Sequence, residues 1–433
     1  MALFVAGPSF AQSVTTHKVK KGETIYGIAH AHGITEAELR RANPGMESAD
    51  YVLKKGDKIL VPVTPIPSVG VQPASHLAGD VRQRSINMGV MLPLHDKNGD
   101  GRRMVEYYRG LLLACDSLKR EGISVDVYAW NTPDNGDLTA TLSKPEAAQC
   151  DIIFGPLYSS QMEQLSSFCQ QHGIMLVIPF SINAPQLAVN SHLFQVYQAP
   201  GSTDESTARR FAEWFENYHP VIVDCDDANS SKGGFTKALR QQLDSRGMRY
   251  SLTSIKSASN LFASAFSAQH PNVVVLNTAR IDDLKVMFIK LRDVVASNGN
   301  VKVSFFGYPE WMEMAVSQED NFHRFDMYLP APYYTNMSQP SAQRMASKYR
   351  ASFHQDMSTF TPRLALTGFD HALFFLRGLH KYGSTFDGAA GRFSYLPVQT
   401  PLKFVKLDGG GYQNSAFMFV HYKTNGQIET INY

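Results

Sequence analysis

The chain has 433 residues, of which 43% are hydrophobic and 18% charged, and its formal net charge is +2. This composition is that of a folded protein with more than one domain, because single cores rarely grow beyond about 300 residues. The near-neutral charge and the lack of a basic stripe with interleaved aromatics argue against a nucleic-acid partner. No run approaches the ~20 apolar residues that a membrane-spanning helix needs.

Residues 1–12 have the features of a signal-peptide remnant. They are mostly small and apolar, and residues 9–12, Ser-Phe-Ala-Gln, have the small-x-small pattern of a cleavage site. The alternative is an ordinary N-terminal segment without a targeting role. No cysteine lies near the cleavage point, so a lipid anchor is not indicated. We therefore expect an exported protein of the periplasm or cell envelope.

The four cysteines, Cys115, Cys150, Cys169 and Cys225, show no CxxC spacing and no histidine pattern. Metal binding is therefore not expected, and no motif predicts a cofactor. Export would permit a disulfide, and Cys150 with Cys169 is the pair to test. Buried thiols are the default expectation for all four.

Residues 17–63 predict a small β-α-α-β module. A short strand around Val19 is followed by Thr24, a good helix N-cap, and then by an apolar helical face. Residues 35–38, Thr-Glu-Ala-Glu, have capping-box spacing and open a second helix, which Asn-Pro-Gly at 43–45 ends. Residues 58–61 return as a strand.

These residues resemble a LysM module. Val-x-x-Gly-Glu-Thr-Ile at 19–25, the Ile-Ala helix, Asn-Pro at 43–44 and a closing Val-Pro at 61–62 occur in the family's order. The resemblance implies binding of peptidoglycan, an N-acetylglucosamine-containing glycan, between residues 22–26 and 43–53. Backbone groups would bond the N-acetyl amides there while apolar side chains cover the sugar faces. The implied contact residues are Gly22, Glu23, Thr24, Ile25, Tyr26, Asn43 and Tyr51. Gly22 is more readily explained as structural, and each tyrosine either stacks on sugar or fills the small core.

Residues 64–84 predict a linker, because the first part is rich in proline and small residues and has no helical or strand period. From residue 85 onward, continuous apolar strands alternate with amphipathic helices, and the alternation restarts after Pro200. This repetition predicts an α/β fold with two doubly wound lobes.

The region 85–433 is similar to type I periplasmic binding proteins of the branched-chain-amino-acid type, the substrate-binding components of ABC transporters. The similarity rests on four stretches in order: Ile-Phe-Gly-Pro-Leu-Tyr-Ser-Ser at 153–160, Ile-Pro-Phe-Ser-Ile-Asn-Ala-Pro-Gln-Leu at 178–187, Phe-Gly-Tyr-Pro-Glu at 306–310 and Gly-Phe-Asp-His-Ala-Leu at 368–373. It implies a bilobed clamshell. We expect lobe 1 at 85–199 and 327–385, and lobe 2 at 200–326 and 386–433.

In such folds the ligand lies between the lobes, at the carboxyl ends of the strands. The residues that this predicts for the cleft are Asp96, Ser159, Ser160, Ser181, Asn183 and Glu310. Ser159 or Ser160 would bind an anionic group at a helix N-terminus. Ser181 and Asn183 would offer hydroxyl and backbone donors from the next strand-end loop, and Glu310 would pair with a ligand ammonium. The alternatives are ordinary: a helix cap for Ser160, a turn residue for Asn183 and a solvated charge for Glu310.

Two stretches depart from the amino-acid-binding pattern. Residues 230–233 read Ser-Ser-Lys-Gly where a tyrosine often precedes the glycine, and residues 277–280 read Asn-Thr-Ala-Arg where an aromatic would close the site. A free amino acid is therefore a poorer ligand candidate than a muropeptide or a protein partner.

Residues 96–101, Asp-Lys-Asn-Gly-Asp-Gly, imitate the start of a calcium loop, but position twelve is Tyr107 instead of glutamate. A polar loop beside the cleft is the preferred interpretation, with calcium as the alternative. No GxSxG, P-loop or HExxH pattern and no carboxylate pair with acid/base spacing occurs. We therefore predict no catalytic residues and no enzyme activity.

The sequence predicts a non-catalytic envelope protein that LysM tethers to peptidoglycan, with a clamshell that binds a small molecule, such as an amino acid or muropeptide, or a cell-wall fragment. The alternative is an adaptor that regulates peptidoglycan synthases or hydrolases through protein contacts and binds no solute.

Overall fold

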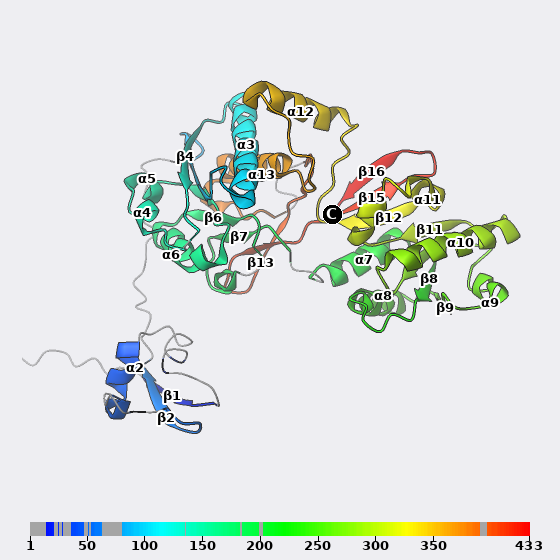
Figure 1. Cartoon of the computed structure of the whole chain (residues 1–433), viewed down its shortest axis with the longest axis horizontal. Coiled ribbons are helices and arrows are strands. Elements are labelled where there is room, and N and C mark those ends of the chain that lie inside the picture. The colour runs from blue at the N-terminus through cyan, green and yellow to red at the C-terminus, as the bar shows by residue number, and fades with distance from the viewer. Residues whose placement is uncertain are drawn as a thin grey trace, which may run out of the picture. The chain divides into compact units, whose positions relative to one another are not determined.

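The structure is a computed structural model of the whole chain (Figure 1). It describes residues 14–20, 25, 28, 36–46, 51, 53–62, 80–134, 136–181, 184–198, 202–389 and 396–433. The predicted signal-peptide remnant and most of the predicted linker lie outside these residues. The chain forms two compact units, residues 1–74 and 75–433. In the described part of the chain, every helix is too short or too polar to cross a bilayer.

The small unit is built on two antiparallel strands, β1 (Val14–Lys18) and β2 (Lys58–Pro62). Helix α2 (Glu36–Ala42) and the 3-10 turn η1 (Pro44–Met46) complete the described elements, and Ile25 and Ile28 are also helical. Val19 is buried just beyond β1. The buried apolar residues of this unit are Val19, Ile28, Leu39, Met46, Ile59 and Val61. So few buried side chains make a core of minimal size.

The large unit contains two seven-stranded sheets, one in each lobe (Figure 1). The lobe 1 sheet has the order β13-β14-β7-β6-β5-β3-β4. Its strands are β3 (Ile86–Leu92), β4 (Val125–Asn131), β5 (Ile152–Phe154), β6 (Met175–Ile178), β7 (Leu193–Gln195), β13 (Phe404–Lys406) and β14 (Tyr412–Asn414). Strands β3 to β7 are parallel, β14 is parallel to β7, and β13 is antiparallel to β14.

The lobe 2 sheet has the order β16-β15-β12-β11-β10-β8-β9. Its strands are β8 (His219–Asp224), β9 (Ser251–Ser254), β10 (Asn272–Leu276), β11 (Val303–Phe306), β12 (Met327–Ala331), β15 (Met418–Tyr422) and β16 (Ile428–Asn432). Strands β8 to β12 are parallel, and β15 and β16 form an antiparallel hairpin against β12. In each sheet the strand order reverses at the first strand, β3 or β8, so each lobe has a topological switch point.

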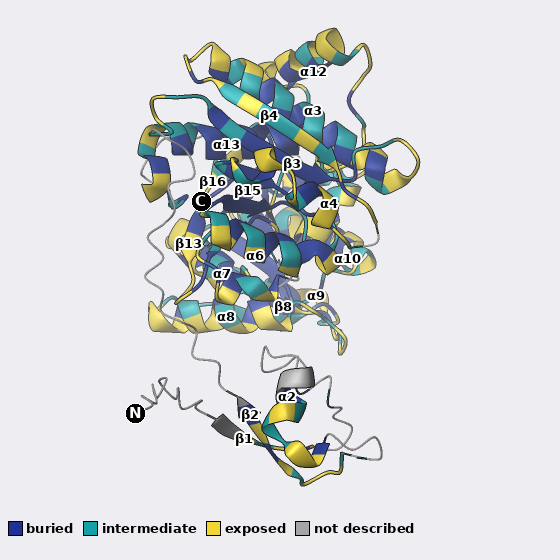
Figure 2. Cartoon of the chain, turned by 90° about the vertical axis from the view of Figure 1, so that its left-hand side faces the viewer, coloured by how far each residue is buried: buried dark blue, intermediate teal, exposed yellow. Residues whose placement is uncertain are grey.

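Helices complete both lobes. Those of lobe 1 are α3 (Gly99–Lys119), α4 (Thr139–Leu142), α5 (Pro145–Ala148), η2 (Ser159–Gln161), α6 (Met162–His172), η3 (Pro185–Ala188), α12 (Pro340–Phe353), α13 (Leu364–Tyr382) and η5 (Gly383–Thr385). Those of lobe 2 are α7 (Asp204–Trp214), α8 (Gly233–Ser245), α9 (Ser259–Ala263), α10 (Ile281–Ser297), η4 (Pro309–Met314) and α11 (Glu319–Arg324). Figure 2 shows buried residues along α13 and exposed residues on the outer turns of α8 and α12.

The lobe boundaries differ from those expected at two places. Strand β12, at 327–331, belongs to the lobe 2 sheet, and β13 and β14, at 404–414, belong to the lobe 1 sheet. The chain therefore crosses between lobes between β7 and α7, between β12 and α12, and between β14 and β15. Strand pairing causes the difference: β12 completes the parallel run beside β11, while β14 adds to the open edge at β7.

Hydrogen bonds join the first crossing segment to the third, and the second to residues 398–400 of lobe 1. The Gln198 side-chain amide donates to the Ala416 carbonyl at 2.7 Å, and the Tyr334 N–H donates to the Gln399 carbonyl at 3.0 Å. Asp370, fully buried on α13, accepts the backbone N–H groups of Val398, Gln399 and Thr400 at 2.7–2.8 Å. Its carboxylate therefore fixes the segment that holds the second crossing.

Helices α3 and α13 lie side by side and approach closely at two glycines (Figure 1). A Cβ atom on Gly110 would lie 2.0 Å from the Ala365 carbonyl oxygen, and one on Gly368 would lie 2.1 Å from the Tyr107 carbonyl oxygen. Backbone atoms cannot move aside as side chains do, so this crossing requires glycine at both positions.

Candidate functional site

The structure gives Asn43, a predicted glycan contact, a structural role. Its side-chain amide donates to the carbonyl groups of Leu39 at 2.8 Å and Leu60 at 2.6 Å, and its oxygen accepts the Leu60 N–H at 2.7 Å. Asn43 thus joins the end of α2 to strand β2, and most of its hydrogen-bonding capacity is used within the fold.

Tyr51 and Ile25, two more predicted glycan contacts, pack partly buried against the small core. The Tyr51 hydroxyl donates to the Asp57 carboxylate at 3.3 Å, and partial burial, with Asp57 beside it, raises the pKa of Tyr51. One side of Tyr51 therefore contacts the core, which leaves both sequence-based interpretations open. Gly22, Glu23, Thr24 and Tyr26 lie outside the described residues.

Three of the predicted cleft residues in lobe 1 lie at the carboxyl ends of β3 and β5, beside the switch point. Asp96, Ser159 and Ser160 are all exposed. The Tyr158 hydroxyl donates to Asp100 at 3.4 Å and to Asp134 at 3.3 Å, which links the loop after β5 to the first turn of α3 and to the loop after β4. Burial and these two carboxylates raise the pKa of Tyr158 to about 12, so it remains a neutral hydroxyl.

The loop that imitates a calcium site is a helix cap. The Asn98 side chain accepts the Gly101 N–H at 2.8 Å at the start of α3. Among the described residues, no group of three His, Cys, Asp or Glu side chains could hold a metal ion. Ser160 is not a helix cap, the alternative role given to it above, because the turn η2 precedes α6 and Gln161 occupies the N-cap position of α6 without a side-chain bond.

Backbone geometry fixes the loop after β5. Gly155 has φ +144°, and a Cβ atom there would lie 2.3 Å from the Met91 carbonyl oxygen of β3. Only glycine fits, which brings residues 156–160 close to the end of β3. Ser181 follows β6, and its carbonyl accepts the Gln195 side chain at 3.1 Å. Asn183 lies outside the described residues.

In lobe 2, Glu310 is already paired with a cation of the same chain. Its carboxylate lies 2.6 Å from the Lys232 ammonium, and that ammonium lies 4.9 Å from the centre of the Tyr308 ring. Lys232 is 16% exposed and Glu310 51%. The position predicted for a ligand ammonium is therefore occupied by Lys232, and the two residues are 78 positions apart in sequence.

A hollow of about 430 Å³ surrounds this pair at the carboxyl ends of β11 and β12. It also contains the Asp204 carboxyl group, whose pKa is raised by burial despite the opposing effect of Lys232. The apolar part of the wall comes from aromatic rings and prolines: Tyr197, Phe235, Phe306, Tyr308, Pro309, Pro330, Pro332 and Phe417. Two carboxyl groups, one ammonium and these rings therefore line the hollow together, so that it offers hydrogen-bonding and aromatic contacts to a ligand.

The switch point of lobe 2 is filled by hydrogen bonds within the chain. Asn277 accepts the Cys225 N–H at 2.8 Å and donates to Asp224 at 2.7 Å, and the Thr278 hydroxyl donates to Asp227 at 2.5 Å. Arg280 donates to the Cys225 carbonyl at 2.9 Å. Asn277, Thr278 and Arg280, from the stretch that departs from the amino-acid-binding pattern, thus bond residues 224–227 of the same chain at this switch point.

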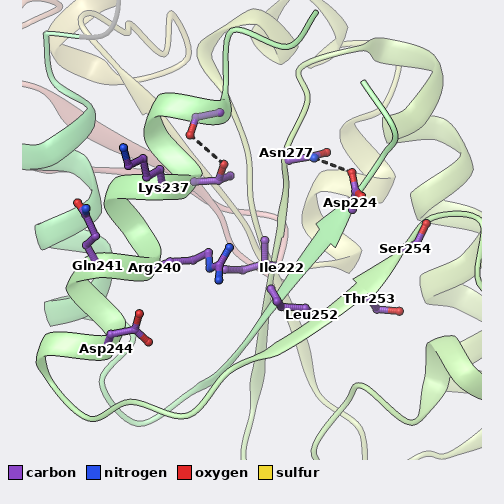
Figure 3. A pocket seen from close by; sticks show the side chains of 12 residues that line it. Ile222, Asp224, Lys237, Arg240, Gln241, Asp244, Leu252, Thr253, Ser254 and Asn277 are labelled. Carbon is purple, nitrogen blue, oxygen red and sulfur yellow. Dashed lines mark hydrogen bonds between the residues drawn. The ribbon is translucent and has the colours of Figure 1, made fainter. Parts of the chain in front are cut away.

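A second hollow, of about 680 Å³, extends from Asp224 and Asn277 along α8 to Asp244 (Figure 3). Ile222 on β8 and Leu252 on β9 line it on the sheet side, and polar side chains of α8 line the other side. None of the predicted site residues lies in it.

The four cysteines are free thiols, and Cys150, Cys169 and Cys225 are buried. Burial raises the pKa of Cys115, Cys150 and Cys225 to about 12, so these groups are poor nucleophiles at neutral pH. The Cys150–Cys169 disulfide that export would permit is not formed in this structure.

Sequence reasoning missed Lys232, Asp204 and Asp370. Lys232 and Asp204 gave no local signal, because their roles depend on strands distant in sequence. Asp370 did give one, since it is a lone acidic residue within the apolar helix Leu364–Tyr382.

Comparison with known proteins agrees with this architecture. Residues 17–62 match the LysM domain family. No curated protein matches the chain. A protein of Rhodospirillum rubrum, assigned as a branched-chain amino acid ABC transporter, matches at TM-score 0.54 and 14% identity, over 80% of this chain and all of that one. LpoA of Haemophilus influenzae matches at TM-score 0.48 and 13% identity, over 83% of this chain and 61% of that one. The chain therefore combines a LysM domain with a unit of the periplasmic-binding-protein fold.

Proposed function

We propose that this chain is an exported cell-envelope protein that its LysM domain tethers to peptidoglycan, with a clamshell unit that binds a small molecule or a cell-wall fragment in its cleft. The LysM match at residues 17–62 carries the proposal, because this family is a sugar-binding module of cell walls. The polar and aromatic hollow beside Lys232 and Glu310 supports a ligand site in lobe 2.

The ligand is a muropeptide or similar wall fragment in preference to a free amino acid. Lys232 already neutralises Glu310, so an α-ammonium group would have to displace an existing ion pair. A larger ligand could gain affinity from the aromatic rings and hydrogen bonds of the hollow without that exchange.

Two experiments test this proposal. Deletion of residues 17–63 should release the protein from purified insoluble sacculi, while the full chain sediments with them; a deletion variant that still sediments would refute the tether.

A thermal-shift screen of muropeptides, sugars and amino acids tests the cleft. A ligand at about 100 times its dissociation constant should stabilise the protein by about 2.7 kcal/mol.

The second candidate is an adaptor that regulates peptidoglycan synthases or hydrolases and binds no solute. The internal bonding of Asn277, Asp224 and Arg280 favours it, because these side chains are bound to the chain itself at the switch point. No stabilisation by any compound of the panel, together with a defined complex between purified protein and a purified wall enzyme, would select this candidate.

A further inference from the structure

The outer face of the small sheet carries two lysines at directly opposite positions. Lys18 and Lys58 are cross-strand partners in the β1–β2 register, and both side chains are exposed. Ile59 and Val61 face the core, so Lys58 lies on the opposite, outer face. Like charges directly opposite each other destabilise an antiparallel pair. This arrangement destabilises the sheet unless another molecule neutralises it.

Two further lysines lie at the same end of the sheet. Lys54 and Lys55 are exposed in the turn before β2. Bonds from the Val19 N–H to the Asp57 carbonyl at 2.9 Å, and from the Gly56 N–H to the Val19 carbonyl at 2.8 Å, hold this turn against the end of β1. We define the lysine cluster as Lys18, Lys54, Lys55 and Lys58.

The cluster is not neutralised within the described part of the chain. None of its four ammonium groups forms an ion pair there. The nearest described carboxylate in sequence, Asp57, accepts the Lys54 backbone N–H at 2.9 Å and the Tyr51 hydroxyl at 3.3 Å. The Asp57 carboxylate therefore bonds groups of the turn itself and, within the described residues, forms no ion pair with a lysine of the cluster.

The lysine cluster lies at the end of the small sheet that leads to the predicted glycan-contacting segments, and this place favours peptidoglycan as its partner. Lys18 is the last residue of β1 and Lys58 the first of β2. In sequence, the predicted glycan-contacting segment 22–26 follows β1 and segment 43–53 precedes β2, so both segments connect to this end of the sheet along the chain. A peptidoglycan strand differs from a neutral N-acetylglucosamine polymer in bearing peptide stems with carboxylate groups. A stem that leaves a glycan bound by these segments would bring its carboxylates toward the lysines.

We infer that the lysine cluster binds the carboxylates of peptidoglycan peptide stems beside the bound glycan. The inference rests on the proposed peptidoglycan tether. It adds to glycan binding a second, charge-dependent contact with the peptide stems. The LysM domain then distinguishes stem-bearing peptidoglycan from bare glycan. Because exposed charge pairs are screened by salt, this part of the affinity depends on ionic strength.

The test compares sedimentation of the full chain with purified sacculi and with chitin at about 50 mM and about 500 mM salt, over which the Debye length falls severalfold. The variant is Lys18→Gln with Lys58→Gln. The matched control is Lys119→Gln with Lys144→Gln, which removes two exposed charges from the large unit. We expect the variant to lose roughly fivefold to tenfold in affinity for sacculi at low salt and nothing for chitin. The control should match the unmodified protein.

Amidation of the sacculus carboxylates provides an arm that needs no variant. The unmodified protein should bind amidated sacculi as weakly as the variant binds native ones. If the variant misfolds and also loses chitin binding, the comparison of native with amidated sacculi still tests whether carboxylates contribute to binding. Salt-independent binding to native and amidated sacculi alike would overturn this inference alone. Binding to neither sacculi nor chitin would overturn the tether as well. Stronger binding to phosphatidylglycerol vesicles than to sacculi, lost in the variant, would instead assign the cluster to a lipid surface.

Discussion

Adjacent polar residues of α13, Asp370 and His371, are both fully buried but differ in how their hydrogen bonds are satisfied. Asp370 accepts three backbone N–H groups from residues 398–400. His371 bonds the Tyr107 hydroxyl through Nδ1 at 2.9 Å, and its Nε2 has no partner in the described structure. Asp370 therefore stabilises the fold through these bonds, whereas His371 is tolerated only while neutral.

His371 makes the large unit sensitive to acid. Burial lowers its pKa to about 3, from about 6.5 in the unfolded chain. The unfolded state therefore binds the proton first, and stability is lost as pH falls below about 6.5, by about 2 kcal/mol at pH 5. His371→Gln keeps one partner for Tyr107 and should flatten the dependence of the melting temperature on pH between 7 and 5. His270→Gln, at an exposed histidine, should keep the original slope. An unchanged slope in His371→Gln would contradict this assignment.

Asp370 should be essential for the segment that it anchors. In Asp370→Asn a single amide oxygen faces three N–H groups, and the new NH₂ group opposes at least one of them. An unsatisfied buried donor costs about 1–3 kcal/mol, so we expect a loss of about 3 kcal/mol in the free energy of unfolding. Urea denaturation measures it. Asp408→Asn, at an exposed position, should change little; equal effects would show that the three bonds contribute nothing specific.

At the scale of the elements, the close crossing of α3 and α13 depends on two glycines in different parts of the chain. The apolar periodicity of each helix was visible in the sequence, but the partner of each helix was not. Alternating helices and strands likewise predicted two lobes, yet β12 and the β13–β14 pair exchanged sheets. A run of apolar residues identifies a strand; which open sheet edge it completes depends on residues far away in the chain.

Gly368→Ala should disrupt this crossing. The new Cβ atom would lie 2.1 Å from the Tyr107 carbonyl oxygen, so the two helices would have to separate. Overpacking of this kind destabilises by about 1–3 kcal/mol, and a clash with backbone should reach the upper end, which thermal unfolding would detect. Gly99→Ala, also on a helix of this pair, meets no atom within 4 Å and should leave the melting temperature unchanged or slightly higher. Equal melting temperatures for both variants would refute the close approach.

For the whole molecule, local sequence patterns identified the LysM domain and the two-lobed fold but failed where charges from distant segments meet. The LysM pattern is local and was recognised from a few dozen residues. The ion pair of Lys232 and Glu310 forms only when α8 and the segment after β11 are placed side by side, so Glu310 alone suggested a free carboxylate. The cleft of lobe 2 is accordingly less open to an amine than its sequence implied.

Removal of the Lys232 charge should therefore open the cleft to amines. In Lys232→Met the side-chain stem still covers Tyr308, while Glu310 and Asp204 lose their shared cation. Because Glu310 is half exposed, the loss of stability should be below about 1 kcal/mol. We expect free amino acids to raise the melting temperature of this variant and not that of the unmodified protein. Lys237→Met, at an exposed lysine of α8, should behave as the unmodified protein does. A shift in the unmodified protein that Lys232→Met abolishes would mean that Lys232 binds the ligand instead of occupying the place of its ammonium.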